Sequence, residues 1–126
     1  MTYDKFSLKK LFKSFMYASR GVVNLLKTQQ NARIHLVFAI AVATLGYILS
    51  ITRIEATILF FAVTFVISME IINTAIEKLL DIVNPESSKS VEFIKDAMAG
   101  AVLIASIIAL VVTVLIFTPY FNKLLS

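Results

Sequence analysis

The chain has 126 residues, a formal net charge of +4 and a hydrophobic fraction of 59%. A soluble domain carries about 45–50% apolar residues, and a domain this small could not bury the surplus, so we expect lipid to surround most of the chain. The sequence has no cysteine and one histidine, which excludes disulfides, thiolate metal sites and a histidine-rich zinc site. The length fits one domain, residues 1–126.

The first element in chain order is an amphipathic helix within residues 1–33. Leucine, phenylalanine and valine side chains recur there at helical spacing, with basic residues between them. This pattern is typical of a helix that lies in the plane of a membrane surface. The helix could be a plain anchor on anionic lipid, or it could form one wall of a site at the membrane interface.

Three apolar segments follow, and we expect each to cross the membrane. Residues 34–52 and 97–118 are long enough to cross about 30 Å of hydrocarbon. Residues 56–80 begin with fourteen uncharged residues before Glu70, so this segment can span only if its polar side chains share one protected face near an interface. The predicted fold is therefore an all-α membrane protein with one N-terminal surface helix and three transmembrane helices.

The basic residues predict the orientation of these spans. Seven of the twelve lysines and arginines precede the first span. Segments rich in Lys and Arg stay in the cytoplasm. The N-terminus and the loop between the second and third spans are therefore expected inside, and the C-terminus outside.

The second span carries an unusual set of polar side chains on one face. An arc of about 100° on a helix contains Glu70, Asn73, Thr74, Glu77 and Asp81. Carboxylates inside a membrane are costly and are usually functional. A solvated helix end would also explain Glu77 and Asp81, and Asn73 could instead pack against another helix. Glu70 lies roughly two turns deeper than Glu77, where solvation explains it less well.

Lys95 and Asp96 begin the third span on the same side of the membrane. This grouping suits the transfer of a charged group to a lipid-soluble acceptor: one carboxylate could take a proton from a lipid hydroxyl while another holds Mg²⁺. The N–H groups at the start of the third span, together with Lys95, could hold phosphate. A small transporter or a non-catalytic membrane subunit is the alternative, although a transporter generally places its carboxylate near the bilayer midplane.

The motif E-x-x-N-x-A-I-E from Glu70 to Glu77, followed eighteen residues later by Lys95 and Asp96, resembles the small bacterial integral-membrane lipid kinases. That family includes diacylglycerol kinase and undecaprenol kinase, and the resemblance covers nearly the whole chain. It implies phosphorylation of a lipid alcohol by ATP and magnesium. It also implies a homotrimer in the bacterial cell membrane, with the active site facing the cytoplasm and no nucleic-acid partner. The stretch from Arg33 to His35 looks more like the undecaprenol kinase branch, so undecaprenol is the expected substrate and diacylglycerol the alternative.

The resemblance also implies roles for individual residues. Glu70 would be the general base of a catalytic set completed by Asn73 and Asp96. Glu77 would bind the metal, and Lys95 and Asp96 would contact ATP. Looser matches to nucleotide-contacting positions are Lys10, Tyr17, Glu86, Ser87 and Ser88.

Gln29 departs from the family pattern. Members usually place a metal-binding glutamate four residues before the arginine of the Arg33-Ile34-His35 stretch, and this chain has Gln29 there. An amide offers one neutral oxygen, so we expect metal binding to be weaker or to depend more on the ATP phosphates. Alternatively, Gln29 is only a polar residue at the end of the surface helix.

Overall fold

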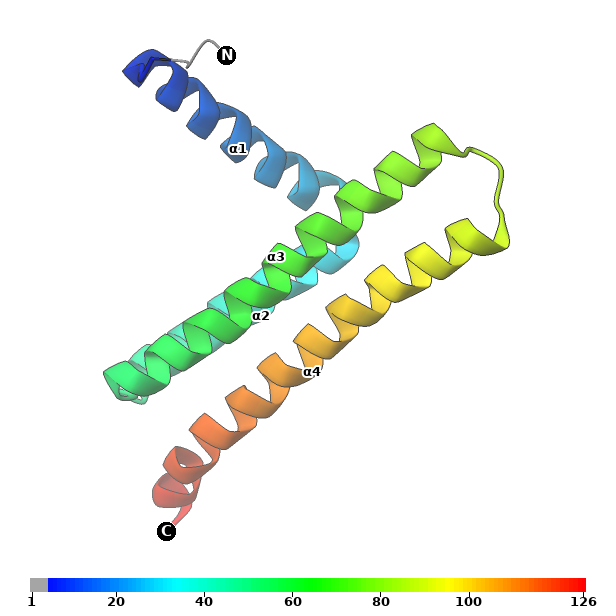
Figure 1. The fold of residues 1–126 in the computed structure, drawn as a ribbon. Coiled ribbons are helices and arrows are strands. Elements are labelled where there is room, and N and C mark those ends of the chain that lie inside the picture. The colour runs from blue at the N-terminus through cyan, green and yellow to red at the C-terminus, as the bar shows by residue number, and fades with distance from the viewer. Residues whose placement is uncertain (1–4) are drawn as a thin grey trace.

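The structure is a computed structural model that describes residues 5–126, which form four α-helices and no strand (Figure 1). The helices are α1 (Leu8–Thr28), α2 (Gln30–Ile48), α3 (Arg53–Val83) and α4 (Lys89–Leu125). Among the described residues, α2, α3 and α4 are long and apolar enough to cross a membrane. The predicted all-α membrane fold is thereby confirmed. The first four residues of the predicted surface segment lie outside the described residues.

The helices α2, α3 and α4 lie along one another, whereas α1 points away from them at a steep angle (Figure 1). α3 packs most extensively against α4 and next against α2. We call the end of the bundle with residues 84–88 the loop end. The α1–α2 junction lies on that side of the turn between α2 and α3 but short of the loop end, part-way along α3 (Figure 1). The opposite end, with the turn between α2 and α3, is the turn end. α3 therefore runs from the turn end to the loop end.

Side-chain caps mark where α1, α3 and α4 begin. The Ser7 hydroxyl accepts a hydrogen bond from the backbone N–H of Lys10 at the start of α1. Thr52 and Glu55 form a reciprocal capping box at the start of α3, and Ser88 caps α4 by accepting from the N–H of Val91. These bonds satisfy N–H groups that a helix start otherwise leaves without a partner.

The apolar core fixes α3 between its two neighbours. Near the turn end, Val42 of α2 and Val63 of α3 pack with Phe117 of α4. Closer to the loop end, Val66 of α3 packs against Ala105 and Ala109 of α4. Small side chains let two helices approach closely, and in lipid this van der Waals contact replaces the hydrophobic effect as the source of stability. The helix face that carries Val66 continues one turn later to Glu70.

The last helix is longer at both ends than the predicted span 97–118. It begins at Lys89 because Ser88 supplies the cap, and the charged residues that follow are compatible with a helix outside the hydrocarbon. At its other end α4 continues past Pro119, and the red C-terminal end of the helix turns away from the line of the rest (Figure 1). Proline lacks the N–H that the helix would use and crowds the preceding turn, which accounts for a bend. Lys95 and Asp96 consequently lie inside the helix and not at its first residues.

Candidate active site

Two polar side chains of α3 are buried in the described part of the chain, and both were predicted site residues. Glu70 keeps 2% of its surface exposed and Asn73 keeps 8%. Their burial follows from the helix face they occupy, since Val66, one turn before Glu70, is in contact with the alanines of α4. The prediction that these residues share a protected face of the second span agrees with their burial.

Three oxygens on this face have no hydrogen-bond partner within residues 5–126: Oε2 of Glu70, Oδ1 of Asn73 and Oγ1 of Thr74. We call these three atoms the oxygen cluster. Residues three and four positions apart on a helix are neighbours, so Asn73 and Thr74 both lie beside Glu70. Buried polar atoms are nearly always paired in native proteins. The Glu70 carboxylate and the Asn73 amide oxygen only accept, whereas the Thr74 hydroxyl can also donate, so the cluster is suited to a ligand that brings its own donor.

His35 also belongs to the surroundings of Glu70, although sequence alone predicts no role for it. Among the described residues, His35 and Glu77 are the ionisable groups close enough for their charges to affect the Glu70 carboxyl. His35 of α2 also lines a cavity of about 220 Å³ together with Val66 of α3 and Ser106 of α4. A groove of about 660 Å³ with mostly apolar walls runs between α2 and α3 from the turn end as far as Ile67. The α3 residues nearest to Glu70 in these linings are Val66 and Ile67, so the apolar space approaches the oxygen cluster from the turn end.

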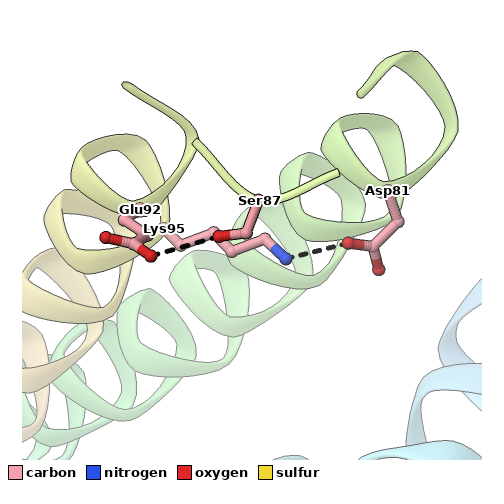
Figure 2. Close-up of polar contacts among 4 residues, drawn as sticks. All are labelled: Asp81, Ser87, Glu92 and Lys95. Carbon is pink, nitrogen blue, oxygen red and sulfur yellow. Dashed lines mark hydrogen bonds and ion pairs between the residues drawn. The ribbon is translucent and has the colours of Figure 1, made fainter. Parts of the chain in front are cut away.

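An ion pair joins the loop ends of α3 and α4. The ammonium of Lys95 donates to the carboxylate of Asp81 over 2.8 Å (Figure 2). Glu77 lies one turn before Asp81 on the same helix, and its negative charge favours the charged form of Lys95. Both partners of the pair are partly exposed, so it adds little stability. An ammonium has three N–H donors, and Lys95 can therefore hold Asp81 and a phosphate oxygen at once.

The serines predicted to contact nucleotide have local roles at the start of α4. The Ser87 hydroxyl donates to Glu92 over 3.1 Å (Figure 2), and Ser88 is the helix cap. The expectation that the first N–H groups of this helix lie beside Lys95 was wrong. The helix begins six residues earlier, at Lys89, because Ser88 supplies its cap. A role for Glu86, Ser87 or Ser88 in binding ATP stays a prediction.

Gln29 lies at the junction of α1 and α2, with an extended backbone between the two helices. Its side chain makes no capping bond to α2 in the part of the chain that the structure describes, so the amide is not engaged there.

Lys10, Tyr17 and Asp96 are exposed, and Glu77 is half-buried. The guanidinium of Arg20 lies over the Tyr17 ring, 5.7 Å from its centre.

The two residues predicted to bind the metal, Glu77 and Gln29, fit magnesium only in part. Within residues 5–126, no three histidine, aspartate or glutamate side chains gather closely enough to enclose a metal ion. Mg²⁺ usually takes one or two carboxylates, keeps several waters and binds substrate phosphates for the rest. Glu77 supplies one such carboxylate, and Gln29 offers a neutral oxygen. The residues therefore fit a magnesium ion that arrives with a nucleotide, and they do not form a closed site for a resident metal.

Comparison with known proteins gave three matches. Residues 16–117 match the sequence model of the family described as prokaryotic diacylglycerol kinase. The undecaprenol kinase of Bacillus subtilis is 35% identical over 112 residues, which cover 89% of this chain and 91% of the relative. A diacylglycerol kinase of Synechocystis sp. is 38% identical over 103 residues, which cover 81% of this chain and 59% of the relative. Apart from Lys10, all the predicted site residues lie inside the range that the family matches.

Proposed function

This chain belongs to the prokaryotic diacylglycerol kinase family and is a lipid kinase, and from that premise we propose that it transfers the terminal phosphoryl group of ATP to undecaprenol. The observation that carries the proposal is the buried Glu70, whose Oε2 has no partner among residues 5–126. A carboxylate in a membrane helix is costly and calls for a function. The alternative of a transporter or a non-catalytic subunit is set aside by the family.

Glu70 is the general base in this proposal. Its carboxylate takes the proton of the lipid hydroxyl, while the hydroxyl oxygen forms a bond to the terminal phosphorus of ATP. The bond between that phosphorus and the bridging oxygen breaks, and its electron pair leaves on ADP. A base must lie about 2.6–3.2 Å from the oxygen whose proton it takes. Asn73, one turn along on the same face, helps to hold the reacting groups in place.

The nucleotide lies at the loop end in this proposal. Lys95 and Asp96 of α4 contact ATP, and Lys10, Tyr17 and Glu86 to Ser88 contribute from the edges. Glu77 holds magnesium, assisted by the amide oxygen of Gln29. When bound, the ion neutralises charge on the phosphates. The support for this arrangement is that Lys95 lies at the loop ends of α3 and α4, where its ammonium contacts Asp81, one turn beyond Glu77.

Undecaprenol is proposed over diacylglycerol because of how much of each relative the chain matches. The undecaprenol kinase of Bacillus subtilis is covered over 91% of its length, whereas the diacylglycerol kinase of Synechocystis sp. is covered over 59%. Both lipids present a primary hydroxyl attached to long hydrocarbon. The apolar walls between α2 and α3 suit hydrocarbon of either kind, so the lipid has to be identified by experiment.

The direct test offers radiolabelled ATP to the purified protein with undecaprenol and diacylglycerol in parallel. We expect label in both lipids, with a kcat/KM for undecaprenol at least about tenfold higher, a difference of about 1.4 kcal/mol in transition-state stabilisation. Equal or inverted preference would replace undecaprenol by diacylglycerol as the substrate. Label in neither lipid would contradict the proposed reaction.

The proposed orientation has ATP bind on the cytoplasmic side, and the basic residues before the first span support it. Because the chain has no cysteine, single cysteines introduced by Lys89→Cys and Ser126→Cys give unique labels. An impermeant maleimide applied to intact cells should label the second variant and leave the first unlabelled. The opposite result would reverse the topology and move the loop end outside.

A homotrimer with sites between subunits is proposed from the resemblance to the family. The exposure of Asp96 and the half-exposure of Glu77 in one chain support it, since residues of a second chain could complete their surroundings. Crosslinking in the membrane followed by mass measurement tests this proposal. A population of monomers with full kinase activity would contradict it.

A further inference from the structure

Thr74 differs from the other threonines within the helices of residues 5–126. A threonine in a helix usually donates its hydroxyl to the carbonyl four residues earlier. Every other helical threonine of that range does so at 2.6–2.8 Å, namely Thr28, Thr44, Thr57, Thr64, Thr113 and Thr118. The Oγ1 of Thr74 is buried and makes no such bond to the carbonyl of Glu70. Its hydroxyl is therefore available to another partner.

The position of Thr74 indicates what that partner is. Thr74 follows Glu70 by one helical turn, so their Cβ atoms are about 5–6 Å apart on the same face. One oxygen atom placed between the two side chains can make a hydrogen bond of ordinary length to each. Oε2 of Glu70 also has no partner within the described residues, and Glu70 is 98% buried, since 2% of its surface is exposed. Two unpaired groups on one helix face can therefore share a single partner.

We propose that the Thr74 hydroxyl binds the hydroxyl oxygen of the lipid alcohol and holds it against Glu70. The inference rests on the proposed function, because it takes the lipid hydroxyl as the group that Glu70 deprotonates. A lipid hydroxyl can fill both roles at once. It donates its hydrogen to Glu70, which as a carboxylate only accepts, and its oxygen accepts from Thr74, which has a free donor.

Thr74 then acts on the reacting oxygen throughout the transfer. As the proton moves from the lipid hydroxyl to Glu70, negative charge develops on the oxygen that bonds to phosphorus. A hydroxyl donor aimed at this atom stabilises the charge more than it stabilises the uncharged substrate. Once the oxygen is part of the phosphate ester it is a poorer acceptor, and the bond weakens as product forms. Thr74 should therefore affect turnover with the lipid and leave ATP binding as it is.

The test compares Thr74→Val, which keeps the shape and removes the hydroxyl, with Thr74→Ser, which keeps the hydroxyl. The control is Thr113→Val on α4, because Thr113 is also half-buried but donates to the carbonyl of Ala109 over 2.7 Å. We expect Thr74→Val to lower kcat/KM for the lipid by about ten- to a hundredfold. This loss is smaller than the loss caused by removing a donor of a full oxyanion hole. Thr74→Ser should stay within about threefold of wild type because it keeps a donor. Thr113→Val should match wild type.

The outcomes separate this inference from the proposed function. If the wild type labels undecaprenol and Thr74→Val has the same kinetics as the wild type, the role of Thr74 is overturned and the kinase reaction still stands. Equal losses in Thr74→Val and Thr74→Ser, or an equal rise in KM for ATP, would make Thr74 a packing residue and also overturn it. If the wild type labels diacylglycerol alone, the same variants are judged with that lipid. Should Thr74→Val fail to fold, Thr74→Ala measured against Thr74→Ser gives the same comparison.

Discussion

Glu55 at the turn end and Glu70 toward the loop end are two carboxylates of the same helix with opposite surroundings. Oε2 of Glu55 accepts from the backbone N–H of Thr52 over 2.9 Å and from the hydroxyl of Tyr120 on α4. Oε2 of Glu70 accepts from nothing within residues 5–126. One carboxylate completes a helix cap and ties α4 to α3, while the other is buried beside two more unpaired oxygens.

The difference shows that a carboxylate in a membrane helix does not by itself identify a site. The sequence predicts Glu55 just before the span of residues 56–80 and Glu70 within it, and the structure places both on α3. What distinguishes them is whether local groups satisfy the oxygens: Thr52, three residues before Glu55, does so by capping. The oxygens that the fold leaves unsatisfied are the ones available to a substrate. The predictions below test this distinction.

The largest effect is expected from Glu70→Gln, which removes the base and keeps the shape. General base catalysis contributes about 10²–10⁴-fold, and turnover should fall by that factor. The matched variant Glu55→Gln, on the same helix, should keep turnover near that of wild type. Steady-state phosphorylation of the lipid by equal amounts of folded protein gives both values. If Glu70→Gln keeps more than about a tenth of wild-type turnover, Glu70 is not the base.

Glu77→Gln should change the magnesium requirement. Glu77 is the proposed carboxylate ligand, and a hard divalent cation binds a neutral amide less well, so the magnesium concentration for half-maximal rate should rise about tenfold or more. KM for the lipid should change little. A magnesium titration at saturating lipid measures both effects. If the midpoint stays at its wild-type value, the metal is held elsewhere.

Gln29→Glu should act in the opposite direction and less strongly. A second anionic ligand beside Glu77 should lower the half-maximal magnesium concentration by about twofold to fivefold. Repeating the titration in a Glu77→Gln background supplies the control. If both side chains bind the same ion, Gln29→Glu should no longer lower the magnesium requirement once Glu77 is replaced. An unchanged titration would mean that Gln29 is only the linking residue between α1 and α2.

The smallest effect on activity is expected at the turn end. Tyr120→Phe removes the hydroxyl that bonds to Glu55 and should lower the unfolding temperature without changing turnover below it. Tyr47→Phe is the control, because Tyr47 is exposed on α2. Thermal unfolding followed in detergent, with turnover measured on the same samples, compares them. A loss of turnover in Tyr120→Phe without a loss of stability would show that the turn end takes part in the reaction.

The sequence predicts the elements of this fold better than their ends. Apolar runs identified the three membrane helices, but the charged first turns of α4 gave no apolar signal, and the helix still begins at Lys89 because Ser88 caps it. The face shared by Glu70 and Asn73 was predictable from helical periodicity, since both residues lie on one long helix. Their burial required the additional fact that α4 packs on that face through Ala105 and Ala109.

Contacts between helices were beyond sequence reasoning. Asp81 and Lys95 are fourteen residues apart and meet only because α3 and α4 run side by side at the loop end. Thr74 was visible on the polar face, yet its unpaired hydroxyl depends on a side-chain rotation that no sequence pattern encodes. His35 reaches the surroundings of Glu70 from a neighbouring helix. Each of these requires the packing of at least two helices.

The central claim is that Glu70 performs the chemical step and does not serve to bind substrate. A single-turnover experiment with radiolabelled ATP and undecaprenol, run beside an ATP-binding measurement on the same preparations, separates the two for Glu70→Gln. The account predicts an ATP affinity within about twofold of wild type and a phosphoryl-transfer rate at least about a hundredfold lower. A fall in ATP affinity that matches the fall in transfer rate, or transfer at the wild-type rate, would contradict it.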